Sequence, residues 1–306
     1  MTNNNTNSRT GIENCGSGNG DRSTPTSRLS PLASRRGKVF KRVIVGLAVL
    51  LVLLLGFLAY ENRHDIYYWW HGEVVVDRSK YPIVGIDVSS HNGDIDFYKV
   101  KNDGYTFVII KASQGIKEKR QRDKNFSNNY DRAKANGLKI GAYHYFEMGE
   151  DGVNQAKNFV EAVGWRHLDL PLIIDVEEDN ETNKNISDDI TMKNLNAMID
   201  NLQSRGFKVM IYTNGNGYKK YVKDRLPINV NLWICSFKDP EKIKHIPNQL
   251  QQYSKKGRVN GINGDVDLDV FNGNEKQWER WLNNAAPLPA DTTTNIIEDI
   301  NYEISK

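Results

Sequence analysis

The sequence predicts an α/β protein, a closed barrel of strands and helices that is preceded by a single membrane-spanning helix. Two observations lead to this fold class. Over about 200 residues, strand-like apolar runs alternate with segments of helical spacing, which is typical of βαβ units. Ahead of them, residues 43–60 read "VIVGLAVLLVLLLGFLAY". This uncharged run is just long enough to cross the roughly 30 Å hydrocarbon core of a bilayer.

The positive charge of the chain is concentrated in its first 42 residues. The whole chain has a net charge of +3. Residues 1–42 hold eight Lys and Arg against Glu13 and Asp21, giving +6, so the remainder is near −3. A nucleic-acid-binding protein keeps its basic patch on the folded part, so we exclude nucleic acid as a partner. The first 34 residues are rich in Asn, Ser, Thr and Gly, and we expect 1–42 to be a disordered cytoplasmic tail.

The apolar run 43–60 could also be the core helix of a soluble protein or a cleaved signal peptide. It is far more apolar than any other part of the chain. In addition, 42 residues precede it and no A-x-A-like cleavage site follows it, so we favour an uncleaved, single-pass anchor in the cell membrane. Because basic residues precede the run, the N-terminus is expected in the cytoplasm and residues 61–306 outside the membrane.

The segments that flank the predicted barrel domain, 82–283, are short. Residues 61–81 are a linker, in which "YYWWHG" at 67–72 is typical of an interfacial aromatic anchor. Residues 284–306 look like a loose extension. The two cysteines, Cys15 and Cys235, would lie on opposite sides of the membrane and could not pair, and Cys235 is expected to be a small buried apolar residue.

Eight apolar runs favour a closed barrel, with a doubly wound open sheet as the main alternative. Fully apolar strands fit a sheet that is covered on both faces. The first run is followed by "GIDVSSHNG" rather than a G-x-G-x-x-G loop, which disfavours a nucleotide-binding sheet, and we expect no cofactor. The expected strands are 82–88, 106–113, 138–146, 170–177, 207–214, 231–237, 249–254 and 265–271.

Three segments between these runs have the spacing and end signals of helices. Residues 123–137 have apolar side chains on one face and finish at Gly137, a suitable residue just past a helix C-terminus. Residues 152–164 repeat the apolar spacing, and 187–206 begins at Ser187 as the N-cap.

Polar side chains gather where these strands end. In barrels of this class, active sites form at the carboxyl ends of the strands. Each polar residue alone could be a cap or a solvated tip, whereas together they would converge on one rim. These residues are Asp87, Gln114, His144, Tyr145, Asp175, Glu177, Tyr212, Asn214, Trp233, Ser236, Gln252, Tyr253 and Asp267.

The fourth run, "LPLIIDVEED", ends in two acids with Val176 between them. Residues two apart on a strand face the same side, so Asp175 and Glu177 point together. Repulsion and burial raise the pKa of one acid of such a pair, which then can donate a proton while the other stays ionised, as glycosidic bond cleavage requires. Three alternatives remain for these acids: a Ca²⁺ site together with Glu178 and Asp179, a pair of structural acids, or a solvated loop. No other segment has the spacing of a metal site.

An ordered set of motifs resembles the glycoside hydrolase family 25 lysozymes, the muramidases typified by a fungal enzyme. The resemblance covers roughly residues 82–283. The matching pieces are "GIDVSSHNGDIDF" (85–97), "FVIIKASQG" (107–115), "GAYHYF" (141–146), "PLIIDVEE" (171–178), "IYTN" (211–214), "LWICSF" (232–237) and "QQYSKKGRVNGINGDVDLDVFNG" (251–273).

This resemblance implies an irregular α/β barrel and an N-acetylmuramidase that cuts peptidoglycan between N-acetylmuramic acid and N-acetylglucosamine. It assigns Glu177 as the general acid and Asp175 as the assisting carboxylate. Asp175 would act either as a nucleophile or by supporting the acetamide of the substrate, and we favour the acetamide route. Asp87 and Asp267 would line the groove. Aromatic faces for sugars would come from Tyr143, Tyr145, Tyr212, Trp233 and Tyr253.

The sequence departs from the family pattern at two places. Gln114 stands in "KASQG" where the family often has Glu, which affects an auxiliary substrate contact, and "CSF" at 235–237 replaces ends with His or Tyr. All four main acids are kept, so an active enzyme is expected. The main alternative is a non-catalytic, membrane-tethered protein that binds the cell wall within a secretion or division complex. A barrel glycosidase that acts on another polymer, such as chitin, is a third.

Overall fold

The chain divides into two units at Glu61. The predicted tail up to residue 30, the aromatic segment 67–72 and the extension from residue 286 lie outside the described residues. The structure, a computed structural model, describes residues 31–61, 74–116, 122–178, 181–226 and 230–285.

The first unit contains one long helix, α1 (Pro31–Glu61). Within it, Lys38–Tyr60 is 23 residues long and reaches a mean hydropathy of 2.9 with no part buried. At about 1.5 Å per residue this length exceeds the thickness of the hydrocarbon core. By length and composition α1 is therefore a candidate membrane span.

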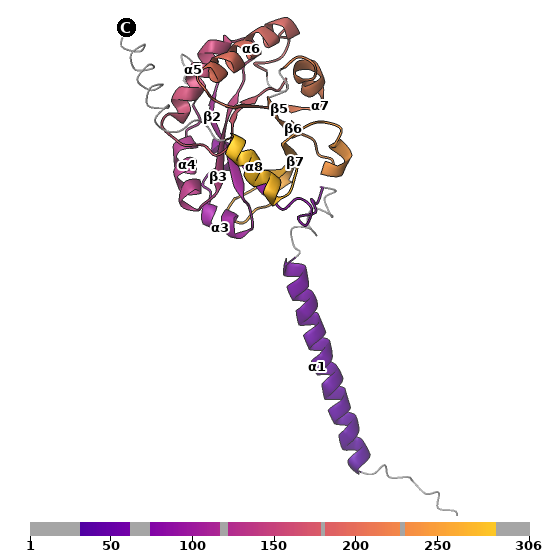
Figure 1. Ribbon diagram of the computed structural model, residues 1–306. Coiled ribbons are helices and arrows are strands. Elements are labelled where there is room, and N and C mark those ends of the chain that lie inside the picture. The colour runs from indigo at the N-terminus through magenta and orange to yellow at the C-terminus, as the bar shows by residue number, and fades with distance from the viewer. Residues whose placement is uncertain (1–30, 62–73, 117–121, 179–180, 227–229, 286–306) are drawn as a thin grey trace, which may run out of the picture. The chain divides into compact units, whose positions relative to one another are not determined.

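In the second unit, eight strands close into a barrel in chain order, which confirms the predicted fold class (Figure 1). Each pair from β1–β2 through β6–β7 is parallel. The strands are β1 (Val84–Val88), β2 (Phe107–Gln114), β3 (Lys139–Tyr145), β4 (Leu172–Asp175), β5 (Val209–Asn214), β6 (Asn231–Cys235), β7 (Leu250–Gly257) and β8 (Val266–Phe271).

Strand β8 is the exception, because it runs antiparallel to both of its neighbours, β7 and β1. The parallel βαβ pattern therefore does not extend to this strand. Its reversed direction places the beginning of β8, not its end, at the rim where β1 ends. As a result Asp267 lies directly opposite Asp87 across the β1–β8 pair.

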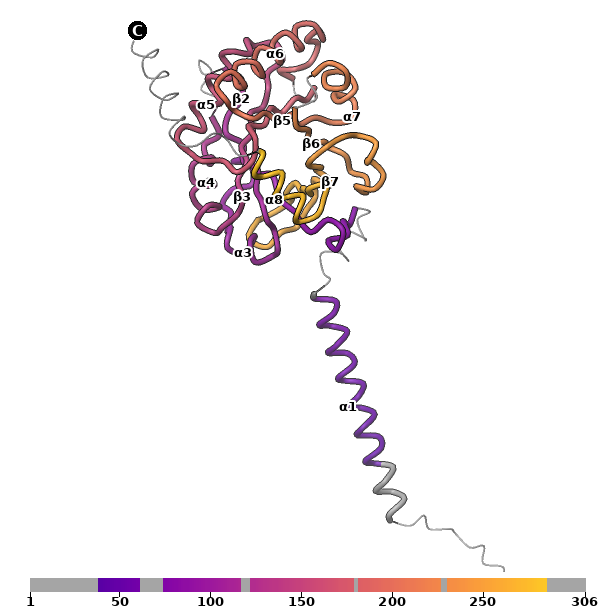
Figure 2. Tube along the Cα trace, in the orientation of Figure 1, coloured from indigo at the N-terminus to yellow at the C-terminus, as the bar shows by residue number. Residues whose placement is uncertain are grey.

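Helices and short helical turns connect most of the strands, and Figure 2 follows the chain through them. Two of the predicted end signals are confirmed: the Ser187 side chain accepts a hydrogen bond from Ile190 N, and Gly137 adopts φ +69° after α4. The helical elements are η1 (Ser90–Asn92), α3 (Phe97–Asn102), α4 (Phe126–Ala135), α5 (Gly152–Val163), α6 (Asp188–Ser204), α7 (Gly215–Gly217), η3 (Tyr218–Val222), η4 (Pro240–Ile243) and α8 (Glu275–Ala285).

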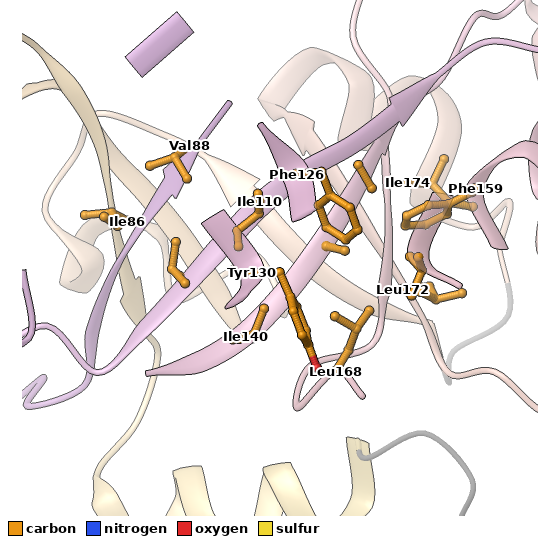
Figure 3. Close-up of a cluster of buried hydrophobic side chains, with 14 of the residues drawn as sticks. Ile86, Val88, Ile110, Phe126, Tyr130, Ile140, Phe159, Leu168, Leu172 and Ile174 are labelled. Carbon is orange, nitrogen blue, oxygen red and sulfur yellow. The ribbon is translucent and has the colours of Figure 1, made fainter. Parts of the chain in front are cut away.

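The larger apolar cluster lies between the barrel and the helices around it. Outward-facing strand residues such as Ile110 and Ile174 meet Phe126 and Tyr130 of α4 and Phe159 of α5 (Figure 3). Burying an aromatic or aliphatic side chain of this size contributes about 1.5–3 kcal/mol. This layer fixes which face of each strand is turned outward and therefore which residues face the interior.

A second apolar cluster fills the barrel interior and is closed at one end by α8. Trp278 of α8 stacks on Phe107 with 5.4 Å between ring centroids and meets Phe271 edge-on at 5.1 Å. Phe107 begins β2 and Phe271 ends the antiparallel β8, so α8 covers the amino-terminal end of the parallel strands. Helix α8 does not cover the carboxyl-terminal end of these strands, where active sites of such barrels form.

Candidate active site

Four carboxylates come together at the carboxyl-terminal end of the parallel strands, and we call them the acidic rim: Asp87, Asp175, Glu177 and Asp267. The pKa of Tyr143, which faces inward from β3, shows that three of these carboxylates are close to one another. Burial, and then Asp87, Asp175 and Asp267, raise the pKa of the Tyr143 hydroxyl well above its ordinary value. Asp87, Asp175 and Asp267 therefore lie near one another, on β1, β4 and β8.

Asp175 and Glu177 keep a common direction although β4 is shorter than the predicted run. The strand ends at Asp175, but Val176 N still donates to Tyr212 O at 2.9 Å, which extends the pairing by one residue. Burial and Cys235 raise the pKa of Tyr212 most, and Glu177 and Asp175 raise it further, so both carboxylates lie near the Tyr212 hydroxyl. Asp175 is buried, whereas Glu177 is partly exposed. The arrangement thus combines an enclosed carboxylate with one that a substrate can reach.

The loop that follows β4 is held by its own contacts. Asn183, a buried residue outside every strand, donates from Nδ2 to the backbone oxygen of Glu177 at 2.7 Å. Glu178 turns away to Lys220, at 2.6 Å, and to the Tyr221 hydroxyl. These two hydrogen bonds lower the pKa of Glu178. Glu178 is engaged on the outside, which disfavours the alternative of a Ca²⁺ site built with it.

A hydrogen-bonded relay leads from Tyr212 to Asp87. The Tyr212 hydroxyl donates to Gln252 Oε1, and Gln252 Nε2 donates to Asp87 Oδ2, each at 2.8 Å. Trp233 Nε1 donates to Asp269 Oδ1 at 2.9 Å. Sequence analysis did not single out Asp269. The signal was present, because Asp267 and Asp269 are two apart on one strand and must face the same side.

Gln114 has a structural role that the sequence did not reveal. Lys111 Nζ donates to Gln114 Oε1 at 3.0 Å, and Gln114 Nε2 donates to Glu147 Oε1 at 3.1 Å. Lys111 is half-buried in the interior, and burial lowers its pKa while Asp175, Asp123 and Glu147 oppose that change. An amide at position 114 satisfies both partners, whereas a Glu there would face the buried Glu147.

Three of the candidate residues are not displayed to a substrate as predicted. Trp233 is 2% exposed and packs within the interior cluster. Tyr253 belongs to the outer cluster, because it follows the inward-facing Gln252 and neighbours on a strand face opposite sides. His144 likewise faces outward, and burial lowers its pKa to about 3. The aromatic side chains that do line the rim side of the interior are Tyr143, Tyr145 and Tyr212.

Cys235 faces the interior from the end of β6. It packs against the interior cluster beside Tyr212, and burial raises the pKa of its thiol to about 12. The thiol is therefore neutral at physiological pH and behaves as an apolar side chain. Within the ranges that the structure describes, no three His, Cys, Asp or Glu side chains are gathered as a metal site requires.

Comparison with known proteins decides the family. The sequence model of glycosyl hydrolases family 25 matches residues 86–262, which is more than half of the chain. This chain belongs to glycosyl hydrolases family 25. The match includes three carboxylates of the acidic rim, Asp87, Asp175 and Glu177, and it ends shortly before Asp267.

Individual members of family 25 resemble the chain in sequence and in structure. The autolytic lysozyme of Clostridium acetobutylicum is 35% identical over 187 residues, which are 61% of this chain and 55% of that protein. Lysozyme M1 of Streptomyces globisporus is 31% identical over 67% of this chain and 72% of that protein. A family 25 glycosyl hydrolase from Bacillus anthracis superimposes with a TM-score of 0.60 at 33% identity, covering 68% of this chain and 96% of that one. The chain thus spans about half the length of the Clostridium relative.

We expect the Asp267 carboxyl group to make the stability of the barrel depend on pH. Burial raises the pKa of Asp267 to about 6, against the opposing effect of Lys255. Because the folded state holds this proton more tightly than the unfolded state, stability is lost as pH rises from about 4 to about 6. Asp267→Asn should therefore stabilise the barrel by about 2 kcal/mol near pH 7.5 and by nothing near pH 4.

Urea unfolding of the full chain in detergent at these two pH values measures this effect. Asp131→Asn, on the exposed side of α4, is the matched control and should give the same difference at both pH values. An equal effect of Asp267→Asn at both pH values would show that its carboxyl group is not the source of the pH dependence.

Proposed function

We propose that the barrel is a muramidase that hydrolyses the β-1,4 bond between N-acetylmuramic acid and N-acetylglucosamine in peptidoglycan. The observation that carries the proposal is the acidic rim itself. Its four carboxylates match the family motifs in sequence, and the closed barrel brings together the strands of Asp87, Asp175 and Asp267, with Glu177 just past the end of β4. The names of the relatives above, autolytic lysozyme and lysozyme M1, support the same activity.

In this proposal the partly exposed Glu177 is the general acid. It protonates the oxygen of the leaving sugar as the glycosidic bond breaks. Asp175, buried one step deeper, stabilises the positive charge that develops on the other sugar, directly or through the acetamide of the substrate. This division between a proton donor and an ionised partner is the one that glycoside hydrolysis uses.

Asp87 and Asp267 would hold the substrate at the rim, where they face each other across β1 and β8. Tyr143, Tyr145 and Tyr212 supply the aromatic side chains next to them. Tyr253 is left out of this role because it faces the outer cluster, and Trp233 because its indole, 2% exposed, is more enclosed than the 7% exposed Tyr212.

Helix α1 would hold the enzyme at the cell membrane with its barrel outside. The mean hydropathy of Lys38–Tyr60 and the basic residues ahead of it support this arrangement. An epitope at residue 1 and a protease added to intact cells test the orientation. The barrel should be degraded while a fragment with the N-terminal epitope survives, whereas loss of the epitope would reverse the topology. From this position the enzyme would remodel the wall next to a division or secretion complex.

The proposed reaction is tested with the full chain in detergent micelles and purified peptidoglycan. The suspension should clear and new reducing sugar ends should appear, while chitin treated in the same way should stay intact. Binding to peptidoglycan without release of reducing ends would favour the non-catalytic, wall-binding alternative, and hydrolysis of chitin would favour a glycosidase of different specificity.

A further inference from the structure

Five interior side chains from five strands form a closed circuit of contacts that includes Asp87 of the acidic rim. We call this set the buried ring: Asp87, Tyr212, Trp233, Gln252 and Asp269. All five are at most 7% exposed. Three members of the ring have no assigned part in the proposed reaction: Trp233, Gln252 and Asp269.

The hydrogen bonds around the ring have defined directions. Tyr212 donates to Gln252, Gln252 donates to Asp87, and Trp233 donates to Asp269. The rings of Tyr212 and Trp233 are in contact, with 4.3 Å between their centroids. The remaining link joins the side chains of Asp87 and Asp269, which are hydrogen-bond partners. Gln252, the donor to Asp87, lies directly opposite Asp269 in the β7–β8 pair and so brings the two carboxyl groups together.

That last link requires a proton. Two ionised carboxylates contain only acceptors and repel each other. Counted as a carboxylate, Asp269 also has its Oδ2 buried without a donor, which costs about 1–3 kcal/mol. A proton on Asp87 removes both penalties, because the Asp87 carboxyl then donates to Asp269 while its other oxygen still accepts from Gln252.

The surroundings favour one proton and not two. Burial raises the pKa of both Asp87 and Asp269 well above the ordinary value, and Asp267 raises both further, so the pair holds a proton. The donors Gln252 and Trp233 each stabilise one ionised carboxylate and so oppose a second proton. The charged or titratable groups that face the pair from the other elements are Tyr143 on β3, Asp175 on β4, Tyr212 on β5, Cys235 on β6 and Asp267 on β8, with Lys255 of β7 acting on Asp267.

We propose that Asp87 and Asp269 share a single proton, held on Asp87, and that Asp269 is the positioning residue that fixes the direction of the Asp87 carboxyl group at the acidic rim. The shared proton also lowers the negative charge next to Asp175 by one. Insofar as Asp269 serves hydrolysis, the inference rests on the proposed function. The protonation of the pair does not depend on it.

Infrared spectroscopy of the full chain in detergent detects the proton directly, through the C=O stretch of a protonated carboxyl group. Glu177→Gln is the background, because it removes the proposed proton donor from the spectrum. At about pH 8, where exposed carboxyl groups and Asp267 are ionised, this background should still show the band of one protonated carboxyl group. Adding Asp87→Asn or Asp269→Asn should abolish it, because an Asn amide then donates to the remaining carboxylate.

Asp169→Asn is the matched control, since Asp169 pairs with Lys139 outside the ring and its loss should leave the band unchanged. Absence of the band in the background alone, or its persistence in both Asn variants, would overturn the proposal, whatever the hydrolysis assays show. With Glu177 intact, Asp269→Ala should also lower the hydrolysis rate about tenfold, the effect of one lost orienting hydrogen bond, and Asp269→Asn should retain more of the rate because its amide still bonds to Asp87.

Discussion

Glu177→Gln should lower the rate of peptidoglycan hydrolysis by about 10²–10⁴-fold, the usual contribution of a general acid. Gln has the same shape but cannot donate a proton to the departing sugar oxygen. The fold should not change, because the backbone oxygen of Glu177, which accepts from Asn183, is still present. Release of reducing ends, measured at equal amounts of folded protein, gives the effect.

Glu178→Gln is the matched control for this variant. Glu178 is adjacent in the chain but is bonded to Lys220 and Tyr221 on the outside. Exposed ion pairs of this kind contribute about 0–1 kcal/mol, so the control should retain its activity within a few-fold and stay folded. Full activity of Glu177→Gln, or an equal loss in both variants, would contradict the role given to Glu177.

Asp175→Asn should lower the hydrolysis rate by about 10²–10³-fold, as the removal of a pre-oriented electrostatic partner usually does. Asp175 is buried at the end of β4, where its charge acts on the site without solvent screening. The strand pairing is made by backbone groups, including the bond from Phe146 N to Asp175 O at 2.9 Å, and Asn preserves it. A loss in kcat with little change in KM is expected, because Asp175 acts on charge that appears only in the transition state.

A substrate without the acetamide group distinguishes the two routes for Asp175. If the acetamide of the substrate takes part, as we expect, peptidoglycan de-N-acetylated at muramic acid should resist the wild-type enzyme as strongly as normal peptidoglycan resists Asp175→Asn. If Asp175 attacks the sugar carbon itself, the wild-type enzyme should cleave both substrates at similar rates.

The barrel was predictable because its evidence is periodic and local. Eight apolar runs with turn and cap residues between them follow from burial on both faces of a sheet. The direction of β8 could not be predicted from that pattern, because an apolar run looks the same whether its strand pairs parallel or antiparallel. The connection after β7 did contain a signal. Residues 258–265 are too few for the crossover of a dozen or more residues that a parallel strand needs.

The candidate site was only partly predictable, because residue type does not distinguish an exposed aromatic face from a core one. Trp233 reads as a sugar-stacking residue in sequence, yet its indole is buried and bonded to Asp269. Gln252 and Tyr253 cannot both face inward on one strand, a constraint that strand alternation alone provides. The partner of Gln114, Glu147, comes from the segment after β3 and is not visible from the "KASQG" motif.

The identity of the sugar at the new reducing end tests the central claim most directly. Peptidoglycan is digested with the full chain in detergent, the new ends are reduced with borohydride, and the sugar alcohols are identified by mass spectrometry. A muramidase leaves N-acetylmuramic acid at the new reducing end, so muramicitol should accumulate with time and stay absent with Glu177→Gln. Accumulation of N-acetylglucosaminitol, or no sugar alcohol above the Glu177→Gln background, would contradict the assignment.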